Sequence, residues 1–327
     1  MKPLISIALV FRKLDDYTLT CIKKCIQLNY DNYEIVLCPD EKISHPILKN
    51  KKITAIKPTG ISDTFAKGKL TIPQKRNISL SICNPKTKYY AFVDDDAYPV
   101  KDWLKNAVET FEKRKNVGAV GGPNLTPRED PILQRVTGNA MQSKLCYGKG
   151  FIRHKVVEAH YVNELPTCNL IVEKEAMDKV GGFDDSQPTG EDAKLCTDIL
   201  AIGKKIYYSP DVKVYHHRRV LFKPFIKQFY LYGLFKARLF KKDKMSSLHY
   251  LTPGVFVLGF IGGAILSLFF PIVFLLYLVA LSLYFLLLLF ESVRESAEFE
   301  EVPLTMLAML IMQFSYGIGF LAGLILV

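Results

Sequence analysis

The stretch YYAFVDDD, residues 89–96, joins five apolar or aromatic residues to three consecutive aspartates. Its first part, residues 89–93, has the length and composition of a buried β-strand. Adjacent carboxylates repel one another unless a cation offsets their charge, and carboxylate oxygens suit Mg²⁺ and Mn²⁺. The stretch therefore predicts a strand that ends at a metal site formed by Asp94, Asp95 and Asp96. The alternative is a solvated acidic turn that caps the following helix.

Strand-like and helix-like stretches alternate on both sides of this motif. We expect strands at residues 4–10, 33–38, 53–57, 117–120, 170–172, 205–208 and 212–215, and helices at 15–28, 73–83, 101–115 and 190–203. Residues 124–165 are polar and charged, and we expect them to be irregular. Alternation of this kind predicts an α/β fold with a mostly parallel sheet. Ligands of such sheets bind at the carboxyl ends of the strands, where the three aspartates lie.

The C-terminal part of the chain is apolar. No charged residue occurs in the 37 residues 254–290 or in the 26 residues 302–327. A helix needs about 20 apolar residues to cross a bilayer, and Pro271 is a plausible break between two helices. We therefore predict a transmembrane region at 251–327 with about three spans, at 252–270, 272–290 and 303–325.

The rest of the chain is basic. Residues 1–250 contain 42 basic and 27 acidic residues, a formal charge of +15, which suits an anionic partner. Next to an apolar tail, a phosphorylated ligand or an anionic lipid surface fits this charge better than nucleic acid, for which no module is recognisable. Residues 223–250 form a basic segment before the first expected span. Its helical part, 223–242, has the pattern of an amphipathic interfacial helix.

The basic segment also predicts the orientation of the chain. Basic residues beside a span favour the cytoplasmic side. The seven cysteines are scattered and odd in number, as expected for reduced thiols. The apolar run at residues 4–11 leads directly into Arg12 and Lys13 without a cleavage site, so we interpret it as a buried strand and not as a signal peptide. These features predict an integral membrane protein whose N-terminal domain, residues 1–222, lies on the cytoplasmic side.

Two further motifs contain groups suited to catalysis. Glu191 and Asp192 follow Gly190 at the start of an expected helix, where they could cap the helix or provide a general base. His216 and His217 follow a short strand and precede Arg218, a combination that could supply a metal ligand and a phosphate contact.

The ordered set of motifs resembles the family 2 glycosyltransferases of the GT-A fold, over about residues 3–240. The stretches that carry the resemblance are VDDDAYPVKDWL, VGAVGGPN, NLIVEKEAMDKVGGFD, GEDAKL and GKKIYYSPDVKVYHHR. The resemblance implies a DxD site that binds Mn²⁺ or Mg²⁺ through Asp96, Asp94 and His216, with His217 as the rival histidine. Asp94 or Asp95 would contact the nucleotide.

The resemblance also implies the remaining roles. Asp192 would be the catalytic base, with Glu191 assisting it. Lys75 and Arg76 match the basic segment near the donor, and Asp40 matches an acid that contacts the nucleotide base. The expected activity is inverting transfer of a sugar from a nucleotide-sugar donor, by default a UDP-sugar. The acceptor would be a hydroxyl on a lipid-linked saccharide or a cell-envelope glycan, at the plasma membrane of a prokaryote.

Three other interpretations remain open at this stage. A polyprenyl-phosphate sugar synthase, similar to dolichol-phosphate-mannose synthase, also joins such a domain to membrane helices, but its phosphate acceptor needs no strong base. A processive polysaccharide synthase would carry a Q-x-x-R-W element, whereas Gln228 is followed by Phe-Tyr-Leu-Tyr. A non-catalytic scaffold should have lost some of the acids, and none is missing.

Overall fold

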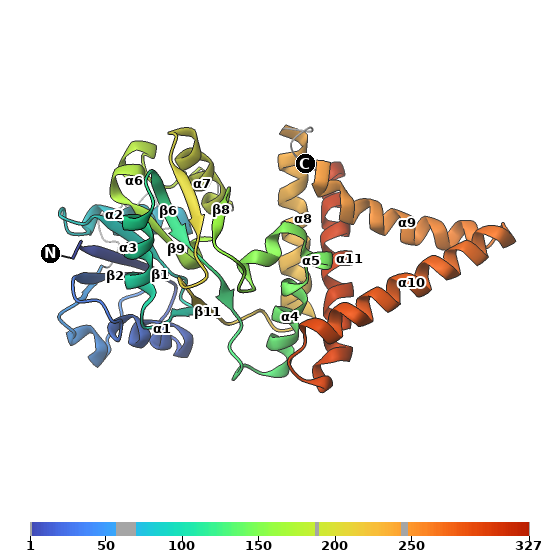
Figure 1. Ribbon diagram of the computed structural model, residues 1–327, viewed down its shortest axis with the longest axis horizontal. Helices are drawn as coiled ribbons and strands as arrows, with labels where there is room; N and C mark the ends of the chain where they lie inside the picture. Colours follow the sequence, from blue (N-terminus) through green and yellow to red (C-terminus); the bar gives the residue numbers. More distant parts are fainter. Residues whose placement is uncertain (1, 57–69, 187–189, 243–247, 327) are drawn as a thin grey trace. The chain divides into compact units, whose positions relative to one another are not determined.

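The computed structural model describes residues 2–56, 70–186, 190–242 and 248–326, and it divides the chain into two compact units (Figure 1). The first unit contains residues Met1–Leu125 and Ile152–His217. The second contains Thr126–Phe151 and Arg218–Val327. Each unit is therefore built from two separate segments of the chain.

The first unit is built on an eight-stranded sheet in the order β3-β2-β1-β4-β9-β6-β10-β8. The strands are β1 Ile5–Phe11, β2 Tyr33–Pro39, β3 Ile53–Ala55, β4 Tyr89–Phe92, β6 Val117–Gly121, β8 His160–Val162, β9 Leu170–Glu173 and β10 Lys205–Tyr208. Neighbouring strands are parallel except where β9 and β8 pair with their neighbours. The predicted mostly parallel sheet is confirmed.

Both faces of this sheet are covered, which is why its central strands are largely apolar. In β1, Ile5, Ile7 and Leu9 face a core that includes residues of α1 and α3. Ala8 faces the opposite core, which includes residues of α6 and α7. The helices of this unit are α1 Asp16–Ile26, α2 Ile72–Ile82, α3 Trp103–Lys113, α6 Lys174–Val180 and α7 Glu191–Ala201.

A second, three-stranded sheet lies beside the aspartate motif. It has the order β5-β11-β7, with strands β5 Ala97–Pro99, β7 Asn124–Leu125 and β11 Val214–His216. β5 and β11 are antiparallel, and His216 pairs with Ala97. β5 is too short to carry a periodic pattern, so the sequence did not predict it, yet its register determines which histidine approaches the aspartates.

The second unit is helical. Its helices are α4 Ile132–Gln142, α5 Lys144–Tyr147, α8 Lys223–Lys242, α9 Thr252–Ser267, α10 Pro271–Glu295 and α11 Val302–Leu326. Short 3₁₀ turns lie at Leu248–Leu251 and Phe299–Glu301 in this unit, at Pro46–Lys49 and Thr167–Asn169 in the first unit, and at Gly148–Arg153 where the two units meet in the sequence. The expectation that residues 124–165 are irregular was wrong. Their segment contains α4, whose buried Val136, Ala140 and Met141 pack with Phe225 of α8 and Met309 of α11.

Among the residues of the second unit that the structure describes, two helices are long and apolar enough to cross a membrane, by length and composition: α10, and the segment Phe299–Leu326 that includes α11. The predicted break is confirmed, because Pro271 is the first residue of α10. The first predicted span is shorter than expected. Its helix α9 has 16 residues, about 24 Å, whereas the hydrocarbon core of a bilayer is about 30 Å thick.

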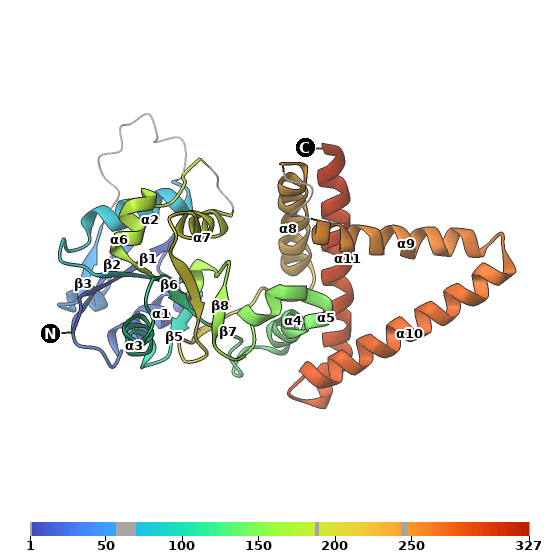
Figure 2. The same cartoon turned by 45° about the horizontal axis from the view of Figure 1, so that its top comes forward.

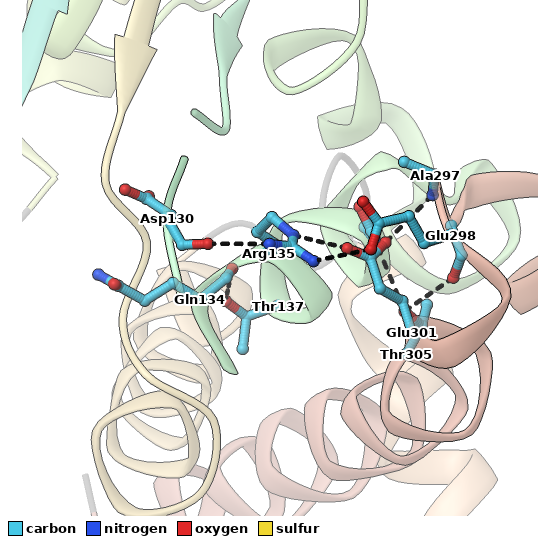
Figure 3. Close-up of polar contacts among 10 residues, drawn as sticks. Asp130, Gln134, Arg135, Thr137, Ala297, Glu298, Glu301 and Thr305 are labelled. Atoms are coloured by element: carbon cyan, nitrogen blue, oxygen red, sulfur yellow. Dashed lines mark hydrogen bonds and ion pairs between the residues drawn. The ribbon is translucent and has the colours of Figure 1, made fainter. Parts of the chain in front are cut away.

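A buried acid joins α4 to the turn between α10 and α11 (Figure 3). Glu301 accepts hydrogen bonds from Arg135 Nε at 2.6 Å, from Asn139 Nδ2 at 2.9 Å and from the backbone N–H of Ala297 at 3.1 Å. The side chain of Glu301 is 1% exposed. A buried carboxylate is tolerated only when it is paired and hydrogen-bonded in this way.

Candidate active site

The aspartates lie where the order of strands in the large sheet reverses. β1 pairs with β2 on one side and with β4 on the other. The chain therefore adds β2 and β3 on one side of β1 and then crosses over to place β4 on the other side. Such a switch point opens a crevice at the carboxyl ends of the strands. β4 ends at Phe92, and Val93 leads directly into Asp94. The aspartate motif therefore lies at the position where a ligand of this fold binds.

One carboxylate of the motif, that of Asp96, contacts His216, the first residue of the histidine pair. His216 Nε2 lies 3.0 Å from Asp96 Oδ1, because the antiparallel register sets His216 opposite Ala97. The ligand atoms of Asp94, Asp96 and His216 all lie within 4.8 Å of one another. The ring of His217 lies instead beside that of Tyr17, tilted by 32° and with centroids 4.3 Å apart. Of the two histidines, it is His216 that the structure groups with the aspartates.

Asp94 and Asp95 have pKa values above the ordinary range of an aspartate. Burial raises the pKa of Asp95 to about 6, and the charges of Asp96 and Asp94 add to the effect. Burial also raises the pKa of Asp94; Arg76 opposes this shift and Asp96 adds to it. Two carboxylates and one imidazole that converge within 4.8 Å form a donor set suited to Mn²⁺ or Mg²⁺. The residues present therefore fit a divalent cation, which would offset the repulsion.

Arg76 joins the aspartate motif to the Glu191 motif. Its Nη2 lies 3.1 Å from Asp94 Oδ1, and its Nη1 lies 2.9 Å from Glu191 Oε1. Arg76 is 5% exposed and Glu191 12%, so their ion pair lies in a poorly hydrated environment, whereas the Asp94 side chain is 35% exposed. The capping box formed by Thr71 and Gln74 fixes the start of α2, the helix that carries Arg76. The sequence predicted Arg76 as a donor-binding residue; the structure shows that it contacts the two acidic motifs.

Asp192 lies in the first turn of α7, after Gly190, which has a φ of +85°. This left-handed conformation favours glycine and turns the chain into the helix. The Asp192 carboxylate accepts a hydrogen bond of 2.8 Å from the N–H of Ala193. Burial raises the pKa of Asp192, and the charges of Glu191 and Glu164 raise it further. A carboxylate with a raised pKa is a stronger base, as proton abstraction requires.

Two residues near Asp192 were not singled out from the sequence. Arg153 donates to Glu164 at 2.7 Å, and the two charges have opposite effects on the pKa of Asp192. Neither residue belongs to a motif, and both come from the segment that was expected to be irregular. No local pattern could have revealed them, because their position depends on how residues 152–165 return to the first unit.

The other predicted donor-binding residues form a separate pair. Lys75 Nζ lies 3.0 Å from Asp40 Oδ1 and donates to the carbonyl oxygen of Phe11 at 3.1 Å. Phe11 ends β1, Asp40 follows β2, and Lys75 lies on α2. The pair therefore lies at the carboxyl ends of the strands, as Asp94 does. Arg218 lies in the second unit, where its Nε donates to Thr126 Oγ1 at 3.1 Å. Its contact with a phosphate stays a prediction.

Comparison with known families identifies the chain. A family model described as glycosyl transferase family group 2 matches residues 91–321, and one described as glycosyl transferase family 2 matches residues 6–171. The chain belongs to glycosyltransferase family 2. The predicted resemblance is therefore confirmed, and the matched residues include both acidic motifs.

Two curated proteins are similar in sequence to this family 2 chain. The pre-mycofactocin glycosyltransferase of Mycobacterium tuberculosis is 29% identical over 160 residues, which are 48% of this chain and 32% of the relative. The chain thus spans about a third of that protein's length. A dolichyl N-acetyl-α-D-glucosaminyl phosphate 3-β-D-2,3-diacetamido-2,3-dideoxy-β-D-glucuronosyltransferase of Methanococcus voltae is 24% identical over 254 residues, 73% of this chain and 74% of the relative.

A solved structure shares the fold of the family 2 chain. It is the mannosyltransferase PcManGT from Pyrobaculum calidifontis in complex with GDP-Man and Mn²⁺. The TM-score is 0.60 at 14% sequence identity, and the match covers 97% of this chain and 87% of that one. The similarity confirms the predicted GT-A fold with an appended helical region.

Proposed function

We propose that this chain is an inverting, metal-dependent glycosyltransferase that moves a sugar from a nucleotide-sugar donor to a hydroxyl acceptor. One observation supports this proposal above the others: Arg76 contacts both Asp94 and Glu191, so the metal-binding acids and the candidate base belong to one connected site. Retention of every acidic group disfavours a non-catalytic scaffold.

On the donor side, Asp94, Asp96 and His216 would hold a Mn²⁺ or Mg²⁺ ion. Such an ion stabilises the negative charge on a departing diphosphate. Lys75 of α2 and Asp40, which follows β2, would bind the nucleotide, and we take a UDP-sugar as the default donor. Arg76 keeps Asp94 and Glu191 in a fixed relation, and is therefore a positioning residue.

On the acceptor side, Asp192 would remove the proton from the attacking hydroxyl. Its raised pKa suits this role, because a carboxylate of ordinary pKa is a weak base at neutral pH. Glu191 is occupied by its ion pair with Arg76. Asp192 is therefore the carboxylate of this motif that would contact an acceptor. Direct attack on the anomeric carbon in a single displacement would invert its configuration.

The acceptor is proposed to be a lipid-linked saccharide. The relative from Methanococcus voltae has a dolichyl phosphate-linked sugar as the acceptor in its name, and this chain covers 74% of that protein. The two long apolar helices support attachment to a membrane, where such an acceptor would be found. The basic residues of α8 favour a catalytic unit on the cytoplasmic side, at the plasma membrane of a prokaryote.

The test compares Asp192→Asn with the parent protein in detergent, supplied with UDP-, GDP- and dTDP-sugars, Mn²⁺ and a lipid-linked acceptor. We expect the variant to lose sugar transfer by at least about 100-fold, since general-base catalysis contributes about 10²–10⁴-fold. Binding of the nucleotide with Mn²⁺ should change little. Normal transfer by the Asn variant would show that Asp192 is not the base, and failure of the parent to bind any nucleotide with Mn²⁺ would contradict the proposal itself.

A further inference from the structure

The two longest apolar helices of the second unit have very different surroundings. In α11 the exposed residues are Pro303, Ile318, Ile325 and Leu326, and the rest of the helix is buried or half-buried. In α10 none of residues 271–287 is buried. Ten of the 25 residues of α11 are buried against the rest of the unit, so packing accounts for part of the apolar character of this helix. It does not account for that of α10.

α11 packs closely along α8. A methyl group added at Gly319 would lie 2.1 Å from the carbonyl oxygen of Tyr230, and one added at Gly323 would lie 2.7 Å from the Cβ of Ala237. Both positions need glycine because the two backbones nearly touch. Residue numbers rise together along the contact, so the two helices run in parallel, side by side in both views (Figures 1 and 2). Whatever orientation α8 takes toward a bilayer, α11 takes as well.

α8 is too polar to cross a bilayer. Only eight residues separate Lys227 from Lys236, which corresponds to about 12 Å of helix, against a hydrocarbon core of about 30 Å. Lys223, Lys227, Arg238 and Lys241 are exposed. These charges suit the anionic headgroups at a membrane surface. An α8 that lies along the surface keeps α11 there too.

The α9–α10 hairpin has the opposite character. It projects away from the α8–α11 pair at a steep angle in both views (Figures 1 and 2). Its tip is apolar and exposed: Leu268 is 81% exposed, Phe269 69% and Ile272 65%. Its base contains the buried acids, with Glu291 accepting from Ser143 at 2.6 Å. Such large exposed apolar area with no charge from residue 254 to 290 requires a hydrocarbon environment.

We propose that the α9–α10 hairpin enters the hydrocarbon core and returns, while α11 lies at the membrane surface as the core helix of the second unit. The amino and carboxyl termini of the chain are then on the same side of the membrane. The inference rests on the membrane attachment proposed above and replaces the third span by a buried helix.

The test measures depth with tryptophan in the full-length chain, reconstituted in vesicles of phosphatidylcholine brominated near either the methyl end or the headgroup end of the acyl chain. Trp103 is the single native tryptophan and is fully buried in the first unit, so the parent protein supplies a constant background. Phe269→Trp reports on the hairpin tip. Ile318→Trp is the matched probe, since Ile318 is exposed near the middle of α11, which would lie deep in the bilayer if α11 crossed it.

We expect deep bromines to quench Phe269→Trp at least about twice as strongly as Ile318→Trp. Equal deep quenching of both would overturn the inference and leave membrane attachment intact. Absence of quenching in Phe269→Trp would mean that no lipid reaches the hairpin, as when a second copy of the chain covers it. That result would overturn both the inference about the hairpin and the proposed membrane attachment. Reporters fused to each terminus, active on one side of the membrane only, give an independent check: opposite sides would require α11 to cross.

Discussion

Asp192 has neighbours of both signs, and these determine the pH range in which it can act as a base. Glu191 and Glu164 raise its pKa, Arg153 lowers it, and burial raises it most. An aspartate must be deprotonated to accept a proton. A raised pKa therefore moves the acid limb of the activity profile above the value near 4 that is typical of an unperturbed aspartate.

Two substitutions should move this acid limb in opposite directions. Glu164→Gln removes a negative charge, so the pKa of Asp192 falls and activity persists to lower pH. Arg153→Gln removes a positive charge, so the pKa of Asp192 rises and the acid limb of the activity profile moves to higher pH. The measurement is kcat/KM against pH with saturating Mn²⁺. If both variants keep the limb of the parent protein, the group that titrates is not Asp192.

At the scale of elements, Arg76 links α2 to the loop after β4 and to the start of α7. A guanidinium can contact two carboxylates at once through separate nitrogens, whereas the ammonium group of lysine is a single point charge. The contact therefore depends on geometry as well as charge. It joins the aspartate motif to the motif that contains Glu191 and Asp192.

Arg76→Lys should lower turnover by about 10- to 100-fold and raise the Mn²⁺ concentration required, as is typical when a residue behind a metal ligand is replaced. A merely structural role would lower thermal stability without changing the Mn²⁺ requirement. Lys179→Ala is the control, because Lys179 also pairs with a glutamate, Glu175, but is 55% exposed. Parent-like turnover and Mn²⁺ dependence in Arg76→Lys would contradict the positioning role.

At the scale of the whole molecule, the chain leaves the first unit after Leu125, contributes α4 and α5 to the second, and returns at Ile152. The second unit therefore combines an inserted segment with the C-terminal residues. Its core combines Val136 and Met141 of α4 with residues of α8 and α11. The ion pair of Arg135 with Glu301 fastens this inserted segment to the turn before α11.

Glu301→Ala should destabilise the protein by about 3 kcal/mol, because it leaves Arg135 and Asn139 without a buried carboxylate partner. Thermal unfolding in detergent, followed by circular dichroism, measures the loss. Glu300→Ala is the matched control, since Glu300 is exposed and should change stability by less than about 0.5 kcal/mol. Equal stability of the two variants would mean that the buried pair contributes little.

Much of the fold was predictable from local patterns. Strand β1, helix α8 and the break at Pro271 follow from runs of apolar residues, charge periodicity and proline, which each depend on a few neighbouring residues. α4 was missed because its sequence is polar enough to resemble a loop. Its buried face became apparent only when α8 and α11 covered it.

The sequence by itself determined that three carboxylates follow a buried strand, that Glu191 and Asp192 open a helix, and that the C-terminal region is apolar. The tertiary structure alone decided that Arg76 contacts Glu191, 115 residues away, that the ring of His216 lies 3.0 Å from the Asp96 carboxylate, and that α11 packs against α8. The physical reason is range. Composition and periodicity fix what a segment can bury, but strand register and helix packing decide which distant groups meet.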